Sequence, residues 1–385
     1  MKVVVIGGGY SGIITALSIK KNNPYNEVIV LEQNDRILKK LKVTGNGKCN
    51  INNINDDIYA YNHPEFIKRY FDIYDVNKQN KFLNDLGIYL KVMNNTGLYP
   101  ISESANNVVN ILLRDLSYYG VKVICNSKVI DYTAKEGRYI LKIENSKDIE
   151  TDIIIIATSL KSSPKINGDT SFINILRSHG YKVTTLLAGL CPLKVKENVT
   201  SLFGVRIKGE VRFNDFIEEG EILFKRDGLS GIVIMDLSSY IARSHIKDGL
   251  IAIRLLDNIS KEEFININKY MDNPLLSITN KELANYIYNE LDIKPSINMS
   301  KENIDKIYDK LEHLTFHFKE LYSYDDSHVT VGGINLDEID ENLMSKREDN
   351  VYFVGEVLDI DGKCGGFNLK WGLVSALIVS KKVNQ

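Results

Sequence analysis

Three glycines near the N-terminus have the spacing of a dinucleotide-binding turn. Gly7, Gly9 and Gly12 follow the β-branched run 3–6, and an apolar helical stretch follows them. In such a turn the first glycine permits a sharp bend, the second lets the backbone approach a pyrophosphate, and the third lets the helix pack on the strand. The helix N-terminus offers its free N–H groups to the phosphates. The pattern therefore predicts a dinucleotide site.

Glu32 completes this pattern. It follows a second apolar strand, 28–31, and stands twenty residues after Gly12. A carboxylate there can accept hydrogen bonds from both hydroxyls of an adenosine ribose, and it disfavours a ribose that carries a 2′-phosphate. Because strand, glycines, helix, second strand and acid occur in register, we expect a nucleotide site rather than a chance run of glycines.

A second stretch, residues 351–372, favours FAD over NAD as the dinucleotide. An apolar strand ends there in Gly355-Glu356, where two-domain flavoproteins place a glycine and an acid against the ribityl chain. Gly365-Gly366 then precede a helix whose first amides have no intrahelical partners. Facing the flavin pyrimidine, these amides would stabilise the negative charge of the reduced ring.

With these motifs the chain resembles the BaiN-type flavoproteins, a family that includes aminoacetone oxidase-like FAD-binding enzymes. The resemblance runs from end to end and implies flavin redox chemistry, with enone-type steroid acids among the family's substrates. The motifs that carry it are GGGYSG with Glu32, VTGNGKCNINN (43–53), LYPISESANNVV (98–109), GEILFKRDGLSG (220–231), VTVGGI (329–334) and GEVLDIDGKCGGFNLKW (355–371).

The chain departs from the family pattern inside several motifs. Asn46 and Lys48 stand where the family usually has glycine and arginine, and Phe367 and Lys370 stand where it usually has tyrosine and glutamine. Ser159-Leu160 replace a glycine pair that follows the buried strand. Two glycines would let the backbone approach the cofactor closely, so this change bears on the geometry of that side and on the substrate, but not on FAD.

The predicted cofactor contacts lie in short segments at the ends of the expected strands. The resemblance implies that the loop 44–50, within a segment 39–53 that reads as polar loop, lies along the flavin side of the pyrophosphate. The predicted contacts are Gly7, Gly9, Tyr10, Ser11, Gly12, Glu32, Gln33, Lys40, Thr44, Gly45, Asn46, Lys48, Cys49, Asn50, Val129, Ala157, Thr158, Gly355, Glu356, Asp359, Gly365, Gly366, Phe367, Asn368 and Leu369. No catalytic acid or base is identified.

Some residue types allow a second interpretation. Cys49 could be a redox thiol beside the flavin, but a small buried packing residue is the favoured reading, and the same holds for Cys364. His313 and His317 stand four residues apart in what reads as a polar helix. Without an acid between them, they favour a solvated helix face over a metal site, and we expect no bound metal.

The elements that position these residues come from both ends of the chain. We predict an α/β fold in which residues 1–184 and 326–385 form a Rossmann-like FAD-binding domain. Residues 185–325 form an inserted β-barrel domain, because alternating runs such as 205–213 read as antiparallel strands. A polar stretch from about 258 to 320 reads as a helical subdomain nested in the insertion.

Composition narrows the functional classes. With 385 residues, 44% hydrophobic and 25% charged, the chain reads as globular and of more than one domain. A net charge of −2 provides no general attraction to nucleic acid or to anionic membranes. We read no targeting segment and no apolar run long enough for a membrane span. The four cysteines form no CxxC pair, which suits the cytoplasm. The oligomeric state is left open.

The sequence is compatible with three functions. The leading one is an FAD-dependent oxidoreductase that reduces a conjugated, apolar small molecule, such as an enone or a steroid, by hydride transfer from flavin N5. NADH or NADPH would serve as a transient donor, because the chain has a single GxGxxG motif. The second is an FAD-dependent oxidase of an amine or aminoketone that passes electrons to oxygen.

The third function is an RNA-modifying or RNA-binding flavoprotein. Its support is a group of basic residues in the insertion, which could contact phosphates. These residues are Lys194, Lys196, Arg206, Lys208 and Arg212. The slightly negative net charge weighs against a nucleic acid partner, so we expect a small-molecule substrate.

Overall fold

The computed structural model describes residues 1–165, 170–256 and 259–385, which form two compact units. The terminal unit contains residues 1–187 and 329–385, and the inserted unit contains residues 188–328. Residue 258, the predicted start of the helical subdomain, lies outside the described residues. Within the described ranges, no helix is both long enough and apolar enough to cross a membrane.

A parallel sheet forms the centre of the terminal unit, with the strand order β19-β10-β1-β2-β6. Its strands are β1 (Lys2–Ile6), β2 (Glu27–Leu31), β6 (Lys122–Ile124), β10 (Ile153–Ile156) and β19 (Val351–Phe353). Val3 pairs with Ile153 on one side and with Val28 on the other. Because β19 pairs with β10, the C-terminal segment completes the sheet begun at the N-terminus, which confirms the predicted fold class.

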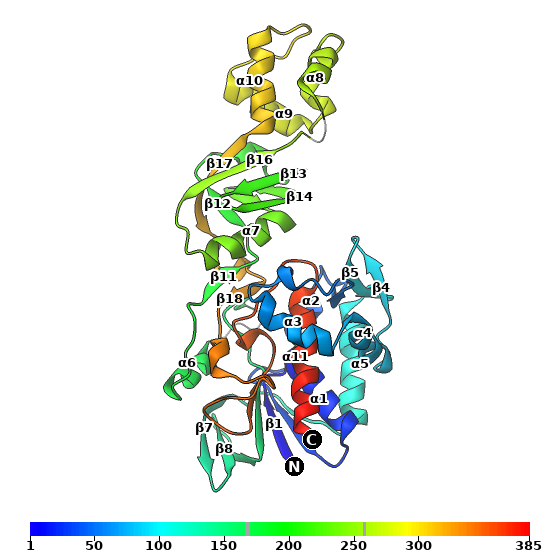
Figure 1. The fold of residues 1–385 in the computed structure, drawn as a ribbon, viewed down its shortest axis with the longest axis vertical. Coiled ribbons are helices and arrows are strands. Elements are labelled where there is room, and N and C mark those ends of the chain that lie inside the picture. The colour runs from blue at the N-terminus through cyan, green and yellow to red at the C-terminus, as the bar shows by residue number, and fades with distance from the viewer. Residues whose placement is uncertain (166–169, 257–258) are drawn as a thin grey trace. The chain divides into compact units, whose positions relative to one another are not determined.

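Two apolar helices from opposite ends of the chain lie side by side in this unit (Figure 1): α1 (Tyr10–Asn22) and α11 (Phe367–Val383). Both are buried along most of their length, and the hydroxyls of Ser18 and Ser380 are 2.7 Å apart between them. The remaining helices of the unit are α2 (Lys39–Val43), α3 (Pro64–Ile73), α4 (Val76–Asp85), α5 (Ala105–Tyr118) and α6 (Ser171–Ser178).

The sequence predicted a polar loop for segment 39–53, but the structure shows regular elements at both of its ends. It begins with the short helix α2, because Leu41 buries its side chain and the Thr44 hydroxyl donates to the Lys40 carbonyl at 3.0 Å. It ends in β3, the first strand of a small antiparallel sheet ordered β3-β5-β4.

The strands of the smaller sheets are β3 (Asn52–Asn53), β4 (Leu90–Met93), β5 (Gly97–Pro100), β7 (Val129–Lys135), β8 (Arg138–Ile143), β9 (Ile149–Thr151), β11 (Leu187–Gly189) and β18 (Val329–Val331).

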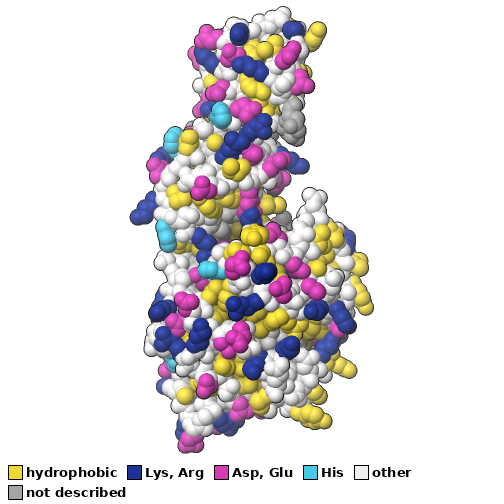
Figure 2. Space-filling model, viewed as in Figure 1, with side chains coloured by type: hydrophobic (Ala, Val, Ile, Leu, Met, Phe, Trp, Pro, Cys, Tyr) yellow, Lys and Arg dark blue, Asp and Glu magenta, His cyan; other side chains and the backbone are white. Residues whose placement is uncertain are grey.

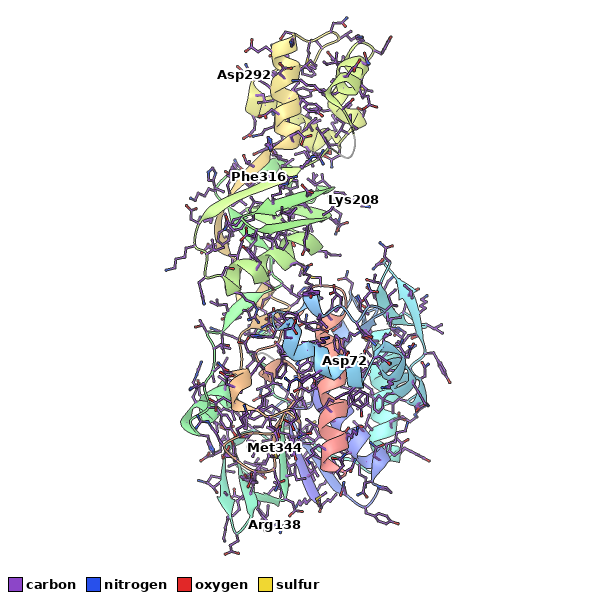
Figure 3. All side chains as sticks on the ribbon, viewed as in Figure 1. Asp72, Arg138, Lys208, Asp292, Phe316 and Met344 are labelled. Carbon is purple, nitrogen blue, oxygen red and sulfur yellow. The ribbon has the colours of Figure 1, made fainter. Side chains whose placement is uncertain are left out.

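The inserted unit contains a closed antiparallel barrel ordered β12-β15-β14-β13-β16-β17. Residues along β13 alternate between exposed and buried, as the sequence pattern predicted. Figure 3 marks Lys208 on β13 and Phe316, which is buried, on β17. The elements of the barrel are β12 (Leu193–Val195), β13 (Arg206–Phe213), β14 (Phe216–Lys225), β15 (Gly228–Ser230), α7 (Ile232–Arg243), β16 (Gly249–Arg254) and β17 (Leu314–Leu321).

The helical part of the inserted unit is shorter than predicted. It consists of α8 (Lys261–Asn268), α9 (Lys281–Leu291) and α10 (Lys301–Glu312). The prediction that helix continues to about 320 is wrong, because Leu314–Leu321 alternates apolar and polar side chains and forms β17. His313 ends α10, whereas His317 lies on β17 with Nδ1 2.6 Å from Glu197 Oε1, so the two histidines share no helix face.

Candidate functional site

The glycine turn (residues 7–12) lies at the carboxyl end of β1, and its three key glycines have different surroundings. A Cβ atom built on Gly7, whose φ is +112°, would lie 2.4 Å from the Ala157 carbonyl oxygen. One built on Gly12 would lie 2.2 Å from the Gly7 carbonyl oxygen. One built on Gly9 would meet no described heavy atom within 4 Å. Packing therefore requires Gly7 and Gly12, whereas Gly9 borders open space.

The N-terminus of α1 is free to bind an anion. Gly9 is its N-cap, and the first intrahelical bond runs from Ile13 N to Gly9 O. Among the described residues no side chain caps this end, and the first turn contains no acidic residue. The N–H groups of the first turn therefore point into the space beside Gly9. This combination of open space and unpaired donors fits a pyrophosphate.

Glu32 is buried at the end of β2 and is held in place from two sides. Its Oε2 accepts a hydrogen bond from Gly8 N at 2.9 Å, and its Oε1 accepts two from the backbone and side-chain nitrogens of Asn34, at 2.8 and 2.5 Å. A carboxylate has about four acceptor positions, so one remains for a ligand even with all three bonds made. Sequence reasoning identified Glu32 but missed Gly8 and Asn34.

Glu32→Ala is expected to weaken FAD binding. Charge-assisted hydrogen bonds contribute roughly 1.5–3 kcal/mol, so the dissociation constant should rise about ten- to a hundredfold. Titration of FAD into the apoprotein measures this change. Asn34→Ala is the matched control, because it removes a neighbour of the carboxylate and keeps the carboxylate itself. Equal FAD affinity for wild type and Glu32→Ala would show that the acid does not bind the ribose.

The backbone conformation of loop 44–50 explains why asparagine can stand at position 46, where the family pattern has glycine. Gly45, Asn46 and Gly47 follow one another with φ values of 59°, 54° and 81°. Asparagine tolerates this left-handed conformation better than most residues, so Asn46 can replace a glycine here. Lys48 forms an ion pair with Glu103 at 2.9 Å. Its contact with the cofactor stays a prediction.

Asn50 connects this loop to the start of α11. A Cβ atom built on Gly366, the N-cap of α11, would lie 2.9 Å from Asn50 Oδ1 and 2.4 Å from the Asn52 carbonyl oxygen. Asn50 Oδ1 is buried and has no hydrogen-bond donor among the described residues. It offers an acceptor that the N3–H of a flavin could use. In Gly366→Val, the valine side chain would clash with the Asn52 backbone, so this substitution tests packing rather than flavin contact.

The Gly355-Glu356 pair is also brought to the site by packing. A Cβ atom on Gly355 would lie 2.2 Å from Ser11 Oγ, on the first turn of α1. Glu356 accepts a hydrogen bond from Ser162 Oγ at 2.7 Å, and its other oxygen is 3.3 Å from Lys40 Nζ. Sequence reasoning missed Ser162, because no motif points to it.

The replaced glycine pair has a structural explanation. Leu160, at the second of these positions, is fully buried in the core of the terminal unit. Ser162, two residues further on, is buried as well and accepts a hydrogen bond from Lys40 Nζ at 2.9 Å. The chain therefore fills this region with a packed side chain and a polar network, where the family pattern has two glycines.

The remaining predicted residues are less tightly connected to the turn. The Phe367 carbonyl accepts from Tyr61 at 2.7 Å, and the Asp359 carbonyl accepts from Asn62 at 3.1 Å. Val129 lies on β7 in a separate sheet, paired with Ile143. For these residues, and for Gln33, Thr44, Asn368 and Leu369, cofactor contact stays a prediction.

The structure bears on the chemistry of Cys49. Its thiol is buried, and burial raises the pKa of this thiol to about 12. It is therefore protonated at neutral pH, which supports packing over redox chemistry. No group of three or more histidine, cysteine, aspartate and glutamate side chains in the described part of the chain could hold a metal ion.

Comparison with known proteins shows which family this chain is similar to. The family model described as "HI0933-like protein Rossmann domain" matches residues 1–382. A 3-dehydro-bile acid delta(4,6)-reductase of Clostridium scindens is 24% identical over 99% of this chain and 98% of its own length. A ribosomal RNA dihydrouridine synthase of Haemophilus influenzae is 25% identical over the same shares.

Solved structures show the same fold at low sequence identity. A 3-ketosteroid delta1-dehydrogenase from Sterolibacterium denitrificans matches 99% of this chain and 99% of its own, with a TM-score of 0.51 and 9% identity. The FrdA subunit of Escherichia coli quinol fumarate reductase matches 100% of this chain and 70% of its own, with a TM-score of 0.53 and 10% identity.

Proposed function

The chain belongs to the HI0933-like family and is an FAD-dependent oxidoreductase, and on this premise we propose that it reduces a carbon–carbon double bond conjugated to a carbonyl group. The proposed substrate is an apolar small molecule of the enone or steroid type, with NADH or NADPH as the electron donor. FAD would supply the two-electron carrier, taking a hydride from the nicotinamide and passing it from N5 to the substrate. The overall reaction adds a hydride and a proton across the double bond and releases NAD(P)⁺.

The two curated relatives support this reaction type, because their names describe related chemistry. A delta(4,6)-reductase acting on a 3-dehydro-bile acid reduces double bonds conjugated to a ketone. Dihydrouridine differs from uridine by two hydrogens across a ring double bond that is conjugated to a carbonyl group. A conjugated double bond is therefore the chemistry they share, and the two relatives differ in whether it belongs to a small molecule or to RNA.

In this chain, the protein's own residues bind and orient the cofactor. The free amides of α1 and the open space at Gly9 would hold the pyrophosphate, and Glu32 would hold the adenosine ribose. The first amides of α11, together with the buried acceptor Asn50 Oδ1, would surround the pyrimidine edge of the flavin. These roles follow from the donors and acceptors that the structure leaves available.

The observation that favours a small molecule over RNA is the pairing of the basic residues on the barrel. Residues 188–328 contain 18 lysines and arginines against 23 aspartates and glutamates. On the face shown in Figure 2, acidic side chains lie among the basic ones. Four of the five candidate RNA-binding residues form ion pairs: Lys194–Glu320, Lys196–Asp248, Arg206–Glu221 and Arg212–Glu210. Phosphate binding would have to replace these acidic partners, which weakens attraction to RNA.

The reductase proposal predicts substrate-dependent oxidation of a nicotinamide. Under anaerobic conditions the purified holoprotein should oxidise NADH or NADPH in the presence of a 3-oxo-Δ4,6 steroid acid and yield a product two hydrogens heavier. Absorbance of the nicotinamide and mass spectrometry of the steroid measure the two halves of the reaction. Hydrogen peroxide released from an aminoketone, with no enone reduction, would contradict the proposal in favour of an oxidase.

RNA modification is the second candidate, favoured by the name of the Haemophilus influenzae relative. It predicts that the protein with NADPH adds two mass units to a uridine in ribosomal RNA, and that salt weakens the interaction steeply. Dihydrouridine formation in RNA without steroid reduction would replace the small-molecule proposal with this one.

A further inference from the structure

Lys370 is a fully buried cation in the first turns of α11. Its ammonium group lies 3.0 Å from the Asn53 carbonyl, 2.8 Å from the Asn55 carbonyl and 2.7 Å from Asp56 Oδ1. An ammonium group has three N–H donors, so these three acceptors satisfy it completely. The Phe71 ring lies beside it, with its centroid 5.3 Å from Nζ.

Keeping a charge in such a place is costly. Burial lowers the pKa of Lys370, and the hydrogen bond that its ammonium group donates to Asp56 opposes this shift. A buried ion pair often contributes little to stability compared with neutral side chains of similar size. The charge at Lys370 therefore calls for an explanation other than packing.

The surroundings of Lys370 include segments of the proposed FAD site. Asn53, whose carbonyl binds the ammonium group, also donates from Nδ2 to the Gly365 carbonyl at 2.9 Å. The next residue, Trp371, donates from Nε1 to the Gly355 carbonyl at 3.3 Å. The ion pair thus joins segment 53–56 to the turn of α11 that follows the two glycines.

We propose that Lys370 and Asp56 form a positioning pair that sets the reduction potential of the bound FAD. Lys370 fixes segment 53–56 against the start of α11, and its charge adds to the positive end of the helix dipole, which favours reduced FAD. Asp56 opposes this effect with a negative charge at the same place. The inference rests on the FAD site assigned above.

Removing one or the other of the two charges should shift the midpoint potential of FAD in opposite directions. Lys370→Gln leaves Asp56 unbalanced and should lower the midpoint potential. Asp56→Asn leaves Lys370 unbalanced and should raise it, and the double variant should lie near wild type. We expect each single change to alter the ratio of reduced to oxidised FAD at a fixed potential about tenfold, which corresponds to about 30 mV for two electrons. Redox titration of the FAD-loaded variants measures this.

A purely structural role gives a different result. It would lower the melting temperature of both variants and leave their potentials equal to wild type or shifted in the same direction, which would overturn the proposal. If Lys370→Gln does not fold, Asp56→Asn decides alone, because the Asp56 side chain is 28% exposed and asparagine keeps an acceptor. A raised potential supports the proposal, and an unchanged or lowered one overturns it. An FAD-loaded protein that reduces no enone would refute the proposed function and leave this test intact.

Discussion

Replacing Gly9 with valine is expected to yield a folded protein that no longer retains FAD. The backbone of Gly9 has φ −75° and ψ 178°, an extended conformation that valine adopts readily. Its Cβ would enter space in which no described atom lies within 4 Å. The branched side chain would therefore block the approach of a pyrophosphate without disturbing the protein itself.

The loss of affinity should be large. Two charge-assisted hydrogen bonds from the α1 N-terminus to the phosphates contribute roughly 3–6 kcal/mol, so the FAD dissociation constant should rise about a hundredfold or more. FAD released by heat from the purified variant, followed by titration of the apoprotein, measures this. The melting temperature of the apoprotein should change little, since valine as an N-cap costs only about 1 kcal/mol. Full FAD content in Gly9→Val would show that the pyrophosphate binds elsewhere.

The local structure around these glycines could be predicted because it depends on spacing along the chain. The numbers of residues that separate Gly7 from Gly12 and from Glu32 are typical of a turn, a helix and a following strand within about thirty residues, as in other folds of this type. The apolar runs at 3–6 and within 152–157 likewise predicted buried strands of a parallel sheet, and they form β1 and β10. The sheet order and its register confirm this strand–helix–strand arrangement and the buried parallel sheet, whereas contact of the glycines and Glu32 with a cofactor stays a prediction.

Other features depend on contacts between distant parts of the chain, and the sequence carries no local sign of them. Lys370 meets Asp56, and Ser162 meets Glu356, across long separations in sequence. Sequence reasoning saw Lys370 only as a departure from a family pattern. The error at Leu314–Leu321 has another cause, because this short alternating segment directly follows the polar helix α10 in the sequence.

Gly12→Ala is expected to destabilise the fold, although helix propensity alone predicts the opposite. Alanine in place of glycine within a helix favours folding by about 1 kcal/mol. At Gly12, however, the added Cβ would lie 2.2 Å from the Gly7 carbonyl oxygen and 3.0 Å from the Ala157 Cβ. Because the nearest atom belongs to the backbone, α1 must move away from β1, and overpacking of this kind costs about 3 kcal/mol.

The two effects leave a net loss of about 2 kcal/mol, which lowers the melting temperature by roughly 4–8 °C in a domain of this size. Thermal unfolding of the apoprotein measures this loss without a contribution from the cofactor. Gly9→Ala is the matched control, since the same methyl group three residues earlier enters open space and loses only about 1 kcal/mol of N-cap preference, so its melting temperature should fall less than that of Gly12→Ala. A melting temperature of Gly12→Ala equal to or above wild type would mean that α1 and β1 are not in close contact. The third glycine of the turn would then serve the cofactor rather than the packing of the helix on the strand.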